Sequence, residues 1–372
     1  MHQGFLPVQD PLKKLPKAFE AFEKVAAHLP KLLVTTHFKS VVTNLPPFPL
    51  HELDPAQYER AMMILSYLGH AWVWGSPVPS TVIPHVLAKP WSEVAGRLQR
   101  PPVLSYASYA LNNWYRLDPE QPVALGNIAL TQNFLGGVDE EWFILVHVDI
   151  EAKAASAIAE LTAAQKSAEE KNQDKLQKNL LKIAGSLEEV CKTMDRMPER
   201  CDPYIYYNRV RPYIHGWKNN PALPDGLVYE GMFDEVPQFF RGETGAQSTI
   251  VPSLDAVLGV THEKDELRVY LQEMREYMPA EHRQFLEKLE SRAAIREFVA
   301  ASKKQHPDLA DIYNRCIDLL YRFRTTHLNY AARYIHKQAE QSIVNSNAVG
   351  TGGTPFMKYL KKHEAETAKF RV

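Results

Sequence analysis

The chain has 372 residues, enough to bury a hydrophobic core without a disulfide framework or a structural metal. Its 43 Lys and Arg residues nearly balance 44 Asp and Glu residues, and the formal net charge of −1 argues against nucleic acid or a membrane surface as a partner. No apolar run approaches the roughly 18 residues that a membrane span needs, and the N-terminal stretch has no apolar signal core. The three cysteines lack CxxC spacing, so we expect no disulfides and a reducing, cytoplasmic location.

Prolines and short apolar patterns predict several helices in the first third of the chain. Asp54 suits an N-cap and Pro55 the first helical position, so we expect a helix that starts there and ends near Gly69. The other helices expected in this part cover residues 15–29, a segment led by Ser92, and residues 103–118. The pattern then weakens over residues 121–137. We therefore expect a small, mainly helical N-terminal domain, 1–133, and a large helical domain, 134–372.

The larger part is predicted to be mainly helical. Residues 142–166 begin with FILVHVDI, which could be a strand, but the apolar stripe that continues beyond it favours a helix with His147 facing inward. Further helices are expected through residues 180–194, 263–278 and 279–290, with a short one at the C-terminus. Because no strand-rich region and no repeat are evident, the predicted fold class is all-α.

Residues 202–231 are unusually rich in aromatic and cationic side chains. They include four tyrosines, Arg209, Arg211, His215 and Trp217. Such a segment suits a planar, anionic ligand, since arginine binds carboxylates and stacks on rings; a folded surface loop is the alternative. A second loop, 239–249, contains glycines that do not follow a strand, so no phosphate-binding loop is expected there.

A long helix is predicted from about Leu309 to His336. Apolar residues recur along it at three- and four-residue spacings, and His327 falls on that stripe with Arg324 one turn earlier. A buried imidazole needs a partner, which could be a backbone carbonyl, a carboxylate or a metal. A packed core histidine is the commoner outcome of this spacing, and a ligand is the alternative.

Three collinear stretches together resemble the indoleamine 2,3-dioxygenase family of haem enzymes. They are RVRPYIHGWKNNPALPDGLVYEG (209–231), FRTTHLNYAARYI (323–335) and GTGGT (350–354). The resemblance implies an enzyme that holds haem b in the large domain, with the small domain covering its distal side. The implied reaction uses O₂ to cleave the C2–C3 bond of L-tryptophan, giving N-formylkynurenine.

The resemblance also implies which residues hold the cofactor. His327 stands at the position of the axial iron ligand, and Arg324 at that of the propionate-binding arginine, oriented by Asp255. The loop over the haem edge would include Gly242, Thr244 and Gly245.

For the substrate, Arg211 matches the arginine that binds the carboxylate, and Thr351 lies in the loop that closes over the amino-acid end. Tyr106, Phe143 and Tyr206 stand where the indole ring is met. The animal enzymes have phenylalanines at the positions of Tyr206 and Tyr207, and serine in place of His147. A distal histidine is instead similar to that of tryptophan 2,3-dioxygenase, where it meets the indole nitrogen.

The expected partners are therefore a small indole substrate and an electron donor of unspecified identity, and we expect a monomer without nucleic-acid or membrane partners. Two other functions stay open: a haem protein that only binds O₂, and an oxygenating enzyme for another indole or aromatic substrate.

Overall fold

The computed structural model describes residues 3–263, 266–341, 350–353 and 356–372. Helices dominate these ranges, which confirms the predicted all-α class. The strands among them form two small pairs. β1 (Val82–Ile83) pairs in parallel with β4 (Val228–Tyr229), and β2 (Tyr115–Arg116) pairs antiparallel with β3 (Ile128–Ala129). No helix in the described ranges is long and apolar enough to cross a membrane.

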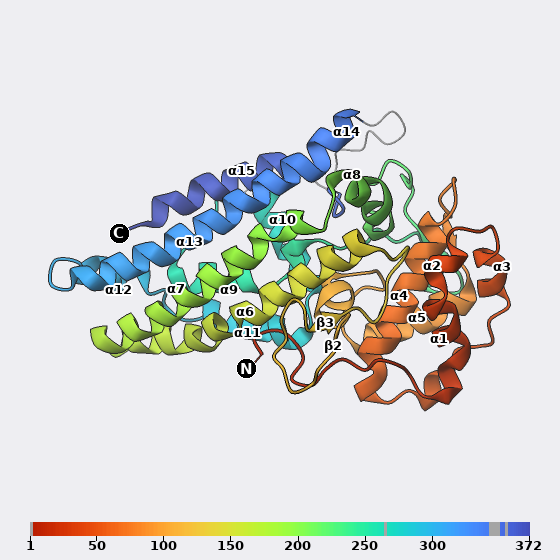
Figure 1. The fold of residues 1–372 in the computed structure, drawn as a ribbon, viewed down its shortest axis with the longest axis horizontal. Helices are drawn as coiled ribbons and strands as arrows, with labels where there is room; N and C mark the ends of the chain where they lie inside the picture. The colour runs from red at the N-terminus through yellow and green to blue at the C-terminus, as the bar shows by residue number, and fades with distance from the viewer. Residues whose placement is uncertain (1–2, 264–265, 342–349, 354–355) are drawn as a thin grey trace.

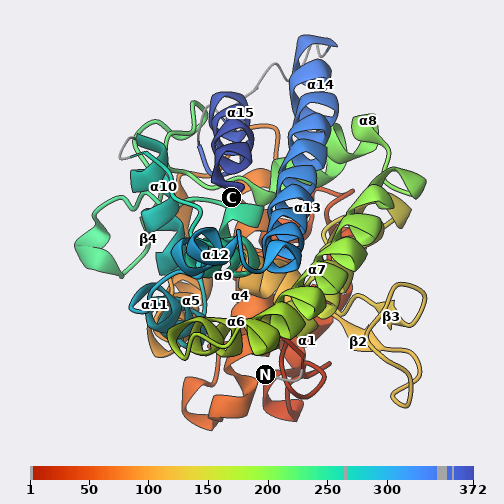
Figure 2. The same cartoon turned by 90° about the vertical axis from the view of Figure 1, so that its left-hand side faces the viewer.

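Long helices form one end of the molecule. α7 (Gln173–Asp195) packs against both α6 (Val138–Glu169) and α13 (Pro307–Ala331), and α15 (Phe356–Thr367) lies along α13 (Figures 1 and 2). The expected helix at 142–166 is confirmed. Its strand-like start is helical because successive residues such as Ile144, Leu145 and Val146 are all buried, which a fully surrounded helix permits.

The shorter helices fall into two groups. The N-terminal group, gathered at the opposite end in Figure 1, is α1 (Glu20–Ala27), α2 (Leu29–Leu32), α3 (Phe38–Thr43), α4 (Tyr58–Trp74) and α5 (His85–Arg97). The others are α8 (Pro203–Ile205), α9 (Ile250–Leu258), α10 (Glu266–Met274), α11 (Ala280–Glu290), α12 (Arg296–Ser302) and α14 (Lys337–Gln341). α13 leads into α14 through one π-helical turn, Ala332–His336, so the long helix predicted there is confirmed in outline.

Three expectations for the N-terminal part were wrong. α4 does not end at Gly69: a β-carbon there would lie 2.2 Å from the Trp91 ring, so this glycine permits close packing inside the helix. α5 begins at His85 and contains Ser92 within it. Residues 103–118 form only one π-helical turn, Ala107–Leu111, because the chain then turns to pair with β3.

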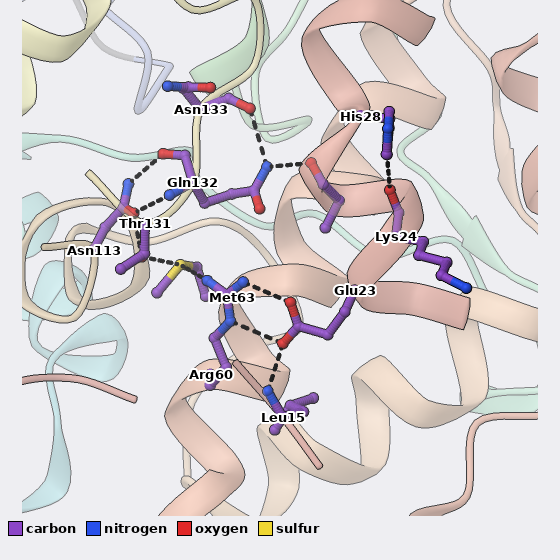
Figure 3. Close-up of polar contacts among 11 residues, drawn as sticks. Leu15, Glu23, Lys24, His28, Arg60, Met63, Asn113, Thr131, Gln132 and Asn133 are labelled. Atoms are coloured by element: carbon purple, nitrogen blue, oxygen red, sulfur yellow. Dashed lines mark hydrogen bonds and ion pairs between the residues drawn. The ribbon is translucent and has the colours of Figure 1, made fainter. Parts of the chain in front are cut away.

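Buried polar contacts fix the N-terminal helices to one another (Figure 3). Glu23 of α1 accepts a hydrogen bond from Arg60 Nη2 of α4 at 2.8 Å and one from the Leu15 N–H at 2.6 Å. Gln132 Nε2 donates to the carbonyl of Ala26 at 2.9 Å, and its own N–H donates to Asn113 Oδ1 at 2.8 Å. The segment leading into α6 is thereby tied to α1.

The start of α6 is fixed by a buried carboxylate. Glu140 accepts hydrogen bonds from the N–H groups of Phe134, Leu135 and Gly136 at 2.6, 3.0 and 2.9 Å. This anchors the turn that precedes Phe143 and His147, one and two helical turns further on.

Two hydrophobic cores lie in the described chain. One surrounds α4 and α5, and the other lies between α6, α7, α9 and α13. The first core also takes in Trp217 and Tyr229, so packing extends across the boundary predicted near residue 133. The division into two domains stays a prediction.

Candidate active site

A cavity of about 790 Å³ lies between α6, α9, α10 and α13. Most of the side chains that the sequence singled out line it: Tyr106, Phe143, His147, Tyr206, Thr244, Gly245, Asp255, Arg324, His327 and Thr351. They come from segments almost 250 residues apart along the chain, so the tertiary fold brings them together. Arg211 and Gly242 are not part of the lining.

His327 faces this cavity from α13. Its side chain has accessible surface, and the residue lines the cavity. Burial, together with the nearby His147, lowers the pKa of His327 to about 4, so the ring is neutral near pH 7. Within the described chain no hydrogen bond to either ring nitrogen is present. The imidazole is therefore not a packed core histidine, and it has a lone pair available to a ligand.

One turn before His327, a buried ion pair stands at the cavity wall. Arg324 Nη2 lies 2.6 Å from Asp255 Oδ2, and Arg324 Nη1 donates to Thr367 Oγ1 at 2.5 Å. His262 Nε2 lies 3.5 Å from the same Asp255 oxygen. Burial would raise the pKa of Asp255, but Arg324 and His262 outweigh it and hold the pKa below its ordinary value. The guanidinium is thus held in place beside the cavity.

His262 also meets a second carboxylate, Glu366, with Nδ1 2.5 Å from Oε2. Burial lowers its pKa, but Asp255 and Glu366 more than compensate and raise it above the ordinary value. The sequence analysis missed His262, Glu366 and Thr367. They come from the loop after α9 and from the C-terminal helix, so no spacing along the chain links them to Arg324.

His147 presents an acceptor nitrogen. Its Nδ1 lies 2.7 Å from the carbonyl oxygen of Phe143, which can only accept, so Nδ1 carries the proton and Nε2 has the free lone pair. Burial lowers the pKa of His147, which keeps the ring neutral. Its ring centroid lies 4.7 Å from that of Phe143 and 6.0 Å from that of Tyr106.

Aromatic rings form the adjoining wall. The centroids of Phe143 and Tyr206 are 4.6 Å apart, and Tyr334 lies edge-on to Tyr206 at 5.9 Å. The Tyr106 hydroxyl donates to Glu151 Oε1 at 3.0 Å, and Ser248 Oγ donates to the same oxygen at 2.7 Å. Because its proton is already engaged, Tyr106 offers a ligand mainly its ring.

Glu151 was also missed, although it lies four residues after His147 and so on the same side of α6. Burial raises the pKa of Glu151 to about 7, while Ser248 and Tyr106 act in the opposite direction.

Arg211 lies outside the cavity lining. It is fully buried in the turn Arg211–Ile214, with its guanidinium 5.3 Å from the centre of the Tyr207 ring. Burial lowers the pKa of Arg211, and the two neighbouring tyrosines act against that shift. Tyr207, Arg211 and Trp217 are buried, whereas Tyr204 and Arg209 are exposed, so only part of this segment lies at the surface.

The segment Gly350–Gly353 is fastened to the loop 241–245. Thr351 Oγ1 donates to the carbonyl of Glu243 at 2.6 Å, and Arg241 Nη1 donates to the carbonyl of Gly352 at 2.5 Å. Behind that loop, Gly242 packs directly on Gly216, where a β-carbon would lie 2.1 Å from the Gly242 nitrogen. The last residue of the GTGGT motif, Thr354, lies outside the described residues.

Together, these features define a helical protein with an interior cavity lined by aromatic side chains, in which a neutral imidazole and a fixed guanidinium stand one turn apart. Comparison with known proteins identifies the family of this chain. The family model for indoleamine 2,3-dioxygenase matches residues 1–370. The chain therefore belongs to the indoleamine 2,3-dioxygenase family, as its sequence motifs predicted, and it is a dioxygenase and an oxidoreductase.

Several relatives show the same extent of similarity. The chain is 37% identical to indoleamine 2,3-dioxygenase 1 of Rattus norvegicus, over 96% of this chain and 91% of the relative. It is 33% identical to indoleamine 2,3-dioxygenase 2 of Homo sapiens, over 98% and 92% of the two chains. It is also 31% identical to the 6-hydroxytryptophan 2,3-dioxygenase of Fusarium equiseti, over 96% and 93%.

Proposed function

We propose that the cavity holds haem b, with His327 as the axial iron ligand, and that the enzyme cleaves the C2–C3 bond of L-tryptophan with O₂ to give N-formylkynurenine. The observation that carries this proposal is the neutral His327 imidazole, which faces a cavity of about 790 Å³ with no hydrogen bond within the described chain. Such a nitrogen is a suitable axial ligand for haem iron.

The chemistry of the cavity lining suits this cofactor. Its lining is mostly apolar and aromatic, as a porphyrin face requires, and Arg324 supplies a fixed cation for a propionate. Within the described ranges, no group of three or more His, Cys, Asp or Glu side chains could hold a metal ion. A single imidazole suffices when a porphyrin provides the other nitrogens. When bound, the haem would supply the dioxygen chemistry.

The protein's own residues would orient the substrate. The rings of Phe143 and Tyr206 would contact the indole, and His147 Nε2 would accept a hydrogen bond from the indole N–H. That acceptor would raise the electron density of the ring and fix its position. Thr351 would help close the amino-acid end of the site.

Arg211 would bind the substrate carboxylate, but it is buried beside the Tyr207 ring and outside the cavity lining. A direct contact therefore requires Arg211 or the ligand to shift. The proposed role rests on the match to the family motif and on a buried cation close to Tyr206.

A second candidate substrate is a ring-hydroxylated tryptophan. One relative is named for 6-hydroxytryptophan, and the wall here carries the Tyr206 hydroxyl and His147, both able to hydrogen-bond a ring hydroxyl. The comparison of kcat/KM for L-tryptophan and 6-hydroxytryptophan decides between them.

The test of the proposed reaction is turnover under ¹⁸O₂ with mass spectrometry of the product. N-formylkynurenine with two labelled atoms supports it, whereas one labelled atom, or none, contradicts it. The axial assignment is tested by His327→Ala, with His336→Ala in the π-helical turn that follows α13 as a control. His327→Ala should purify without stoichiometric haem; a histidine-type spectrum retained in this variant overturns the assignment.

A further inference from the structure

Glu243 places a buried carboxylate at the cavity. The residue is 3% exposed and lines the cavity. Its backbone is fixed on both sides: the Glu243 N–H donates to the carbonyl of Ile214 at 3.1 Å, and its carbonyl accepts from Thr351 Oγ1 at 2.6 Å. The base of the side chain therefore has little freedom to turn away from the cavity.

The carboxylate of Glu243 has no hydrogen-bond or ion-pair partner in the described chain. The other buried acids in the described part of the chain have one. Glu23 pairs with Arg60, Glu140 accepts three backbone N–H groups, and Glu151 accepts from Tyr106 and Ser248. A buried, unpaired carboxylate is strongly unfavourable in its charged form, and burial alone raises the pKa of Glu243 to about 8. A cationic group on a bound ligand could supply the counter-ion that Glu243 lacks.

We propose that Glu243 binds the α-ammonium group of the amino-acid substrate and thereby selects indoles that carry an amine. This proposal rests on the proposed function, which places an indole amino acid in the same cavity. An ammonium group offers a positive charge and three hydrogen-bond donors, which satisfy both oxygens of an otherwise partnerless carboxylate. Charge neutralisation inside the cavity replaces the hydration that each group loses.

The neighbourhood of Tyr206 fits a zwitterionic ligand. Burial raises the pKa of Tyr206; Arg211 acts to lower it and Glu243 to raise it further. A buried cation and a buried anion thus both act on this one hydroxyl. They match the carboxylate and ammonium ends of an α-amino acid, and the aromatic wall lies next to them.

Three ligands distinguish the contribution of the ammonium group to binding from that of the rest of the substrate. L-Tryptophan carries both charges, tryptamine only the ammonium, and 3-indolepropionate only the carboxylate. Their dissociation constants are measured by anaerobic calorimetric titration of the haem-loaded protein, so binding is read without turnover. The variants are Glu243→Gln, which keeps the shape and removes the charge, and Glu243→Asp, which keeps the charge.

Glu243→Gln should weaken L-tryptophan and tryptamine by about 10- to 100-fold, the usual effect of a lost charge-assisted hydrogen bond. Binding of 3-indolepropionate should stay the same or tighten, and Glu243→Asp should restore part of the amine preference. The matched control is Asp149→Asn, a buried acid outside the cavity lining that already accepts from Thr193 and from the Leu125 N–H, and it should leave the ratio between amine and desamino ligands unchanged. Equal binding of tryptamine by Glu243→Gln and the wild type would overturn the proposal, as would equal weakening of all three ligands.

The two proposals fail in different ways. If the wild-type protein binds L-tryptophan with the expected dependence on Glu243 but does not convert it, the reaction is wrong and the Glu243 assignment stands. If it converts L-tryptophan while the Gln variant keeps the wild-type preference for amines, the assignment is wrong and the reaction stands. Thermal unfolding checks the fold of the variant: Glu243→Gln should melt no lower than the wild type, because the described chain provides no partner to lose.

Discussion

Arg324 and Asp255 form a buried ion pair, with 2.6 Å between Nη2 and Oδ2. Asp255 belongs to α9 and Arg324 to α13, so the pair also connects two helices that wall the cavity. His327 lies one turn further along α13. Any change that loosens the pair should therefore affect both the stability of the protein and the position of the proposed iron ligand.

Replacing Asp255 by alanine should lower the free energy of unfolding by about 3–5 kcal/mol, because Arg324 would stay buried without its counter-ion. Urea denaturation measures this, and haem affinity should fall as well. Asp195→Ala is the control: it breaks the Arg322–Asp195 pair, whose side chains are 49% and 44% exposed, and should cost at most about 1 kcal/mol. Similar losses in both variants would contradict a structural role for the buried pair.

His147→Ala should reduce kcat/KM for L-tryptophan by about 2- to 10-fold, the effect of one lost hydrogen bond to the indole N–H. The same variant should leave kcat/KM for 1-methyl-L-tryptophan nearly unchanged, because that substrate has no N–H to donate. Steady-state kinetics with both substrates measure the difference. An equal loss for the two substrates would mean that His147 acts through packing and not through this contact.

His70 should make the protein less stable in mild acid. Its Nδ1 donates to the carbonyl of Tyr213 at 2.7 Å and its Nε2 accepts from the Leu104 N–H at 2.9 Å, so the fold requires the neutral ring. Burial lowers the pKa of His70 from 6.5 to about 4. Between these values the unfolded chain binds a proton and the folded chain does not, so stability is full above pH 6.5 and declines as the pH falls towards 4.

The size of this acid effect follows from the pKa difference and is about 3 kcal/mol by pH 4. Denaturation curves of the wild type and His70→Gln from pH 7 to 4 measure it. The variant should be less stable at pH 7 but should lose less stability on acidification. Parallel curves for the two proteins would rule out His70 as the source.

Gly216→Ala should destabilise the protein by about 1–3 kcal/mol or more, since its new methyl group would meet the Gly242 backbone at 2.1 Å. The loop 241–245, which borders the cavity at Glu243, should be displaced, and ligand binding should weaken. Gly185→Ala is the matched control in α7, where a β-carbon meets nothing within 4 Å, and it should raise stability by about 0.5–1 kcal/mol. Thermal unfolding distinguishes the two, and equal effects would show that the close contact is not limiting.

The long helices could be predicted from local patterns. The apolar stripe of residues 142–166, the helix through 180–194 and the long helix ending near 336 are all present, as is the turn that begins at Pro55 with Asp54 as its cap. These features depend on spacing within one segment, which the sequence records directly. The family followed from several collinear motifs for the same reason.

Other features depended on contacts between distant segments. Gly69 continues a helix because the Trp91 ring packs against it, and residues 103–118 leave the helix because Asn113 and β2 find partners near residues 128–132. Periodicity placed His327 on a buried stripe but did not distinguish a packed core from a cavity. Only the tertiary structure shows that the His327 ring borders a cavity and that Arg211 is buried outside its lining. Nothing in the local pattern marks Glu243, because the absence of a partner is a property of the whole surrounding fold and not of the residue's own segment.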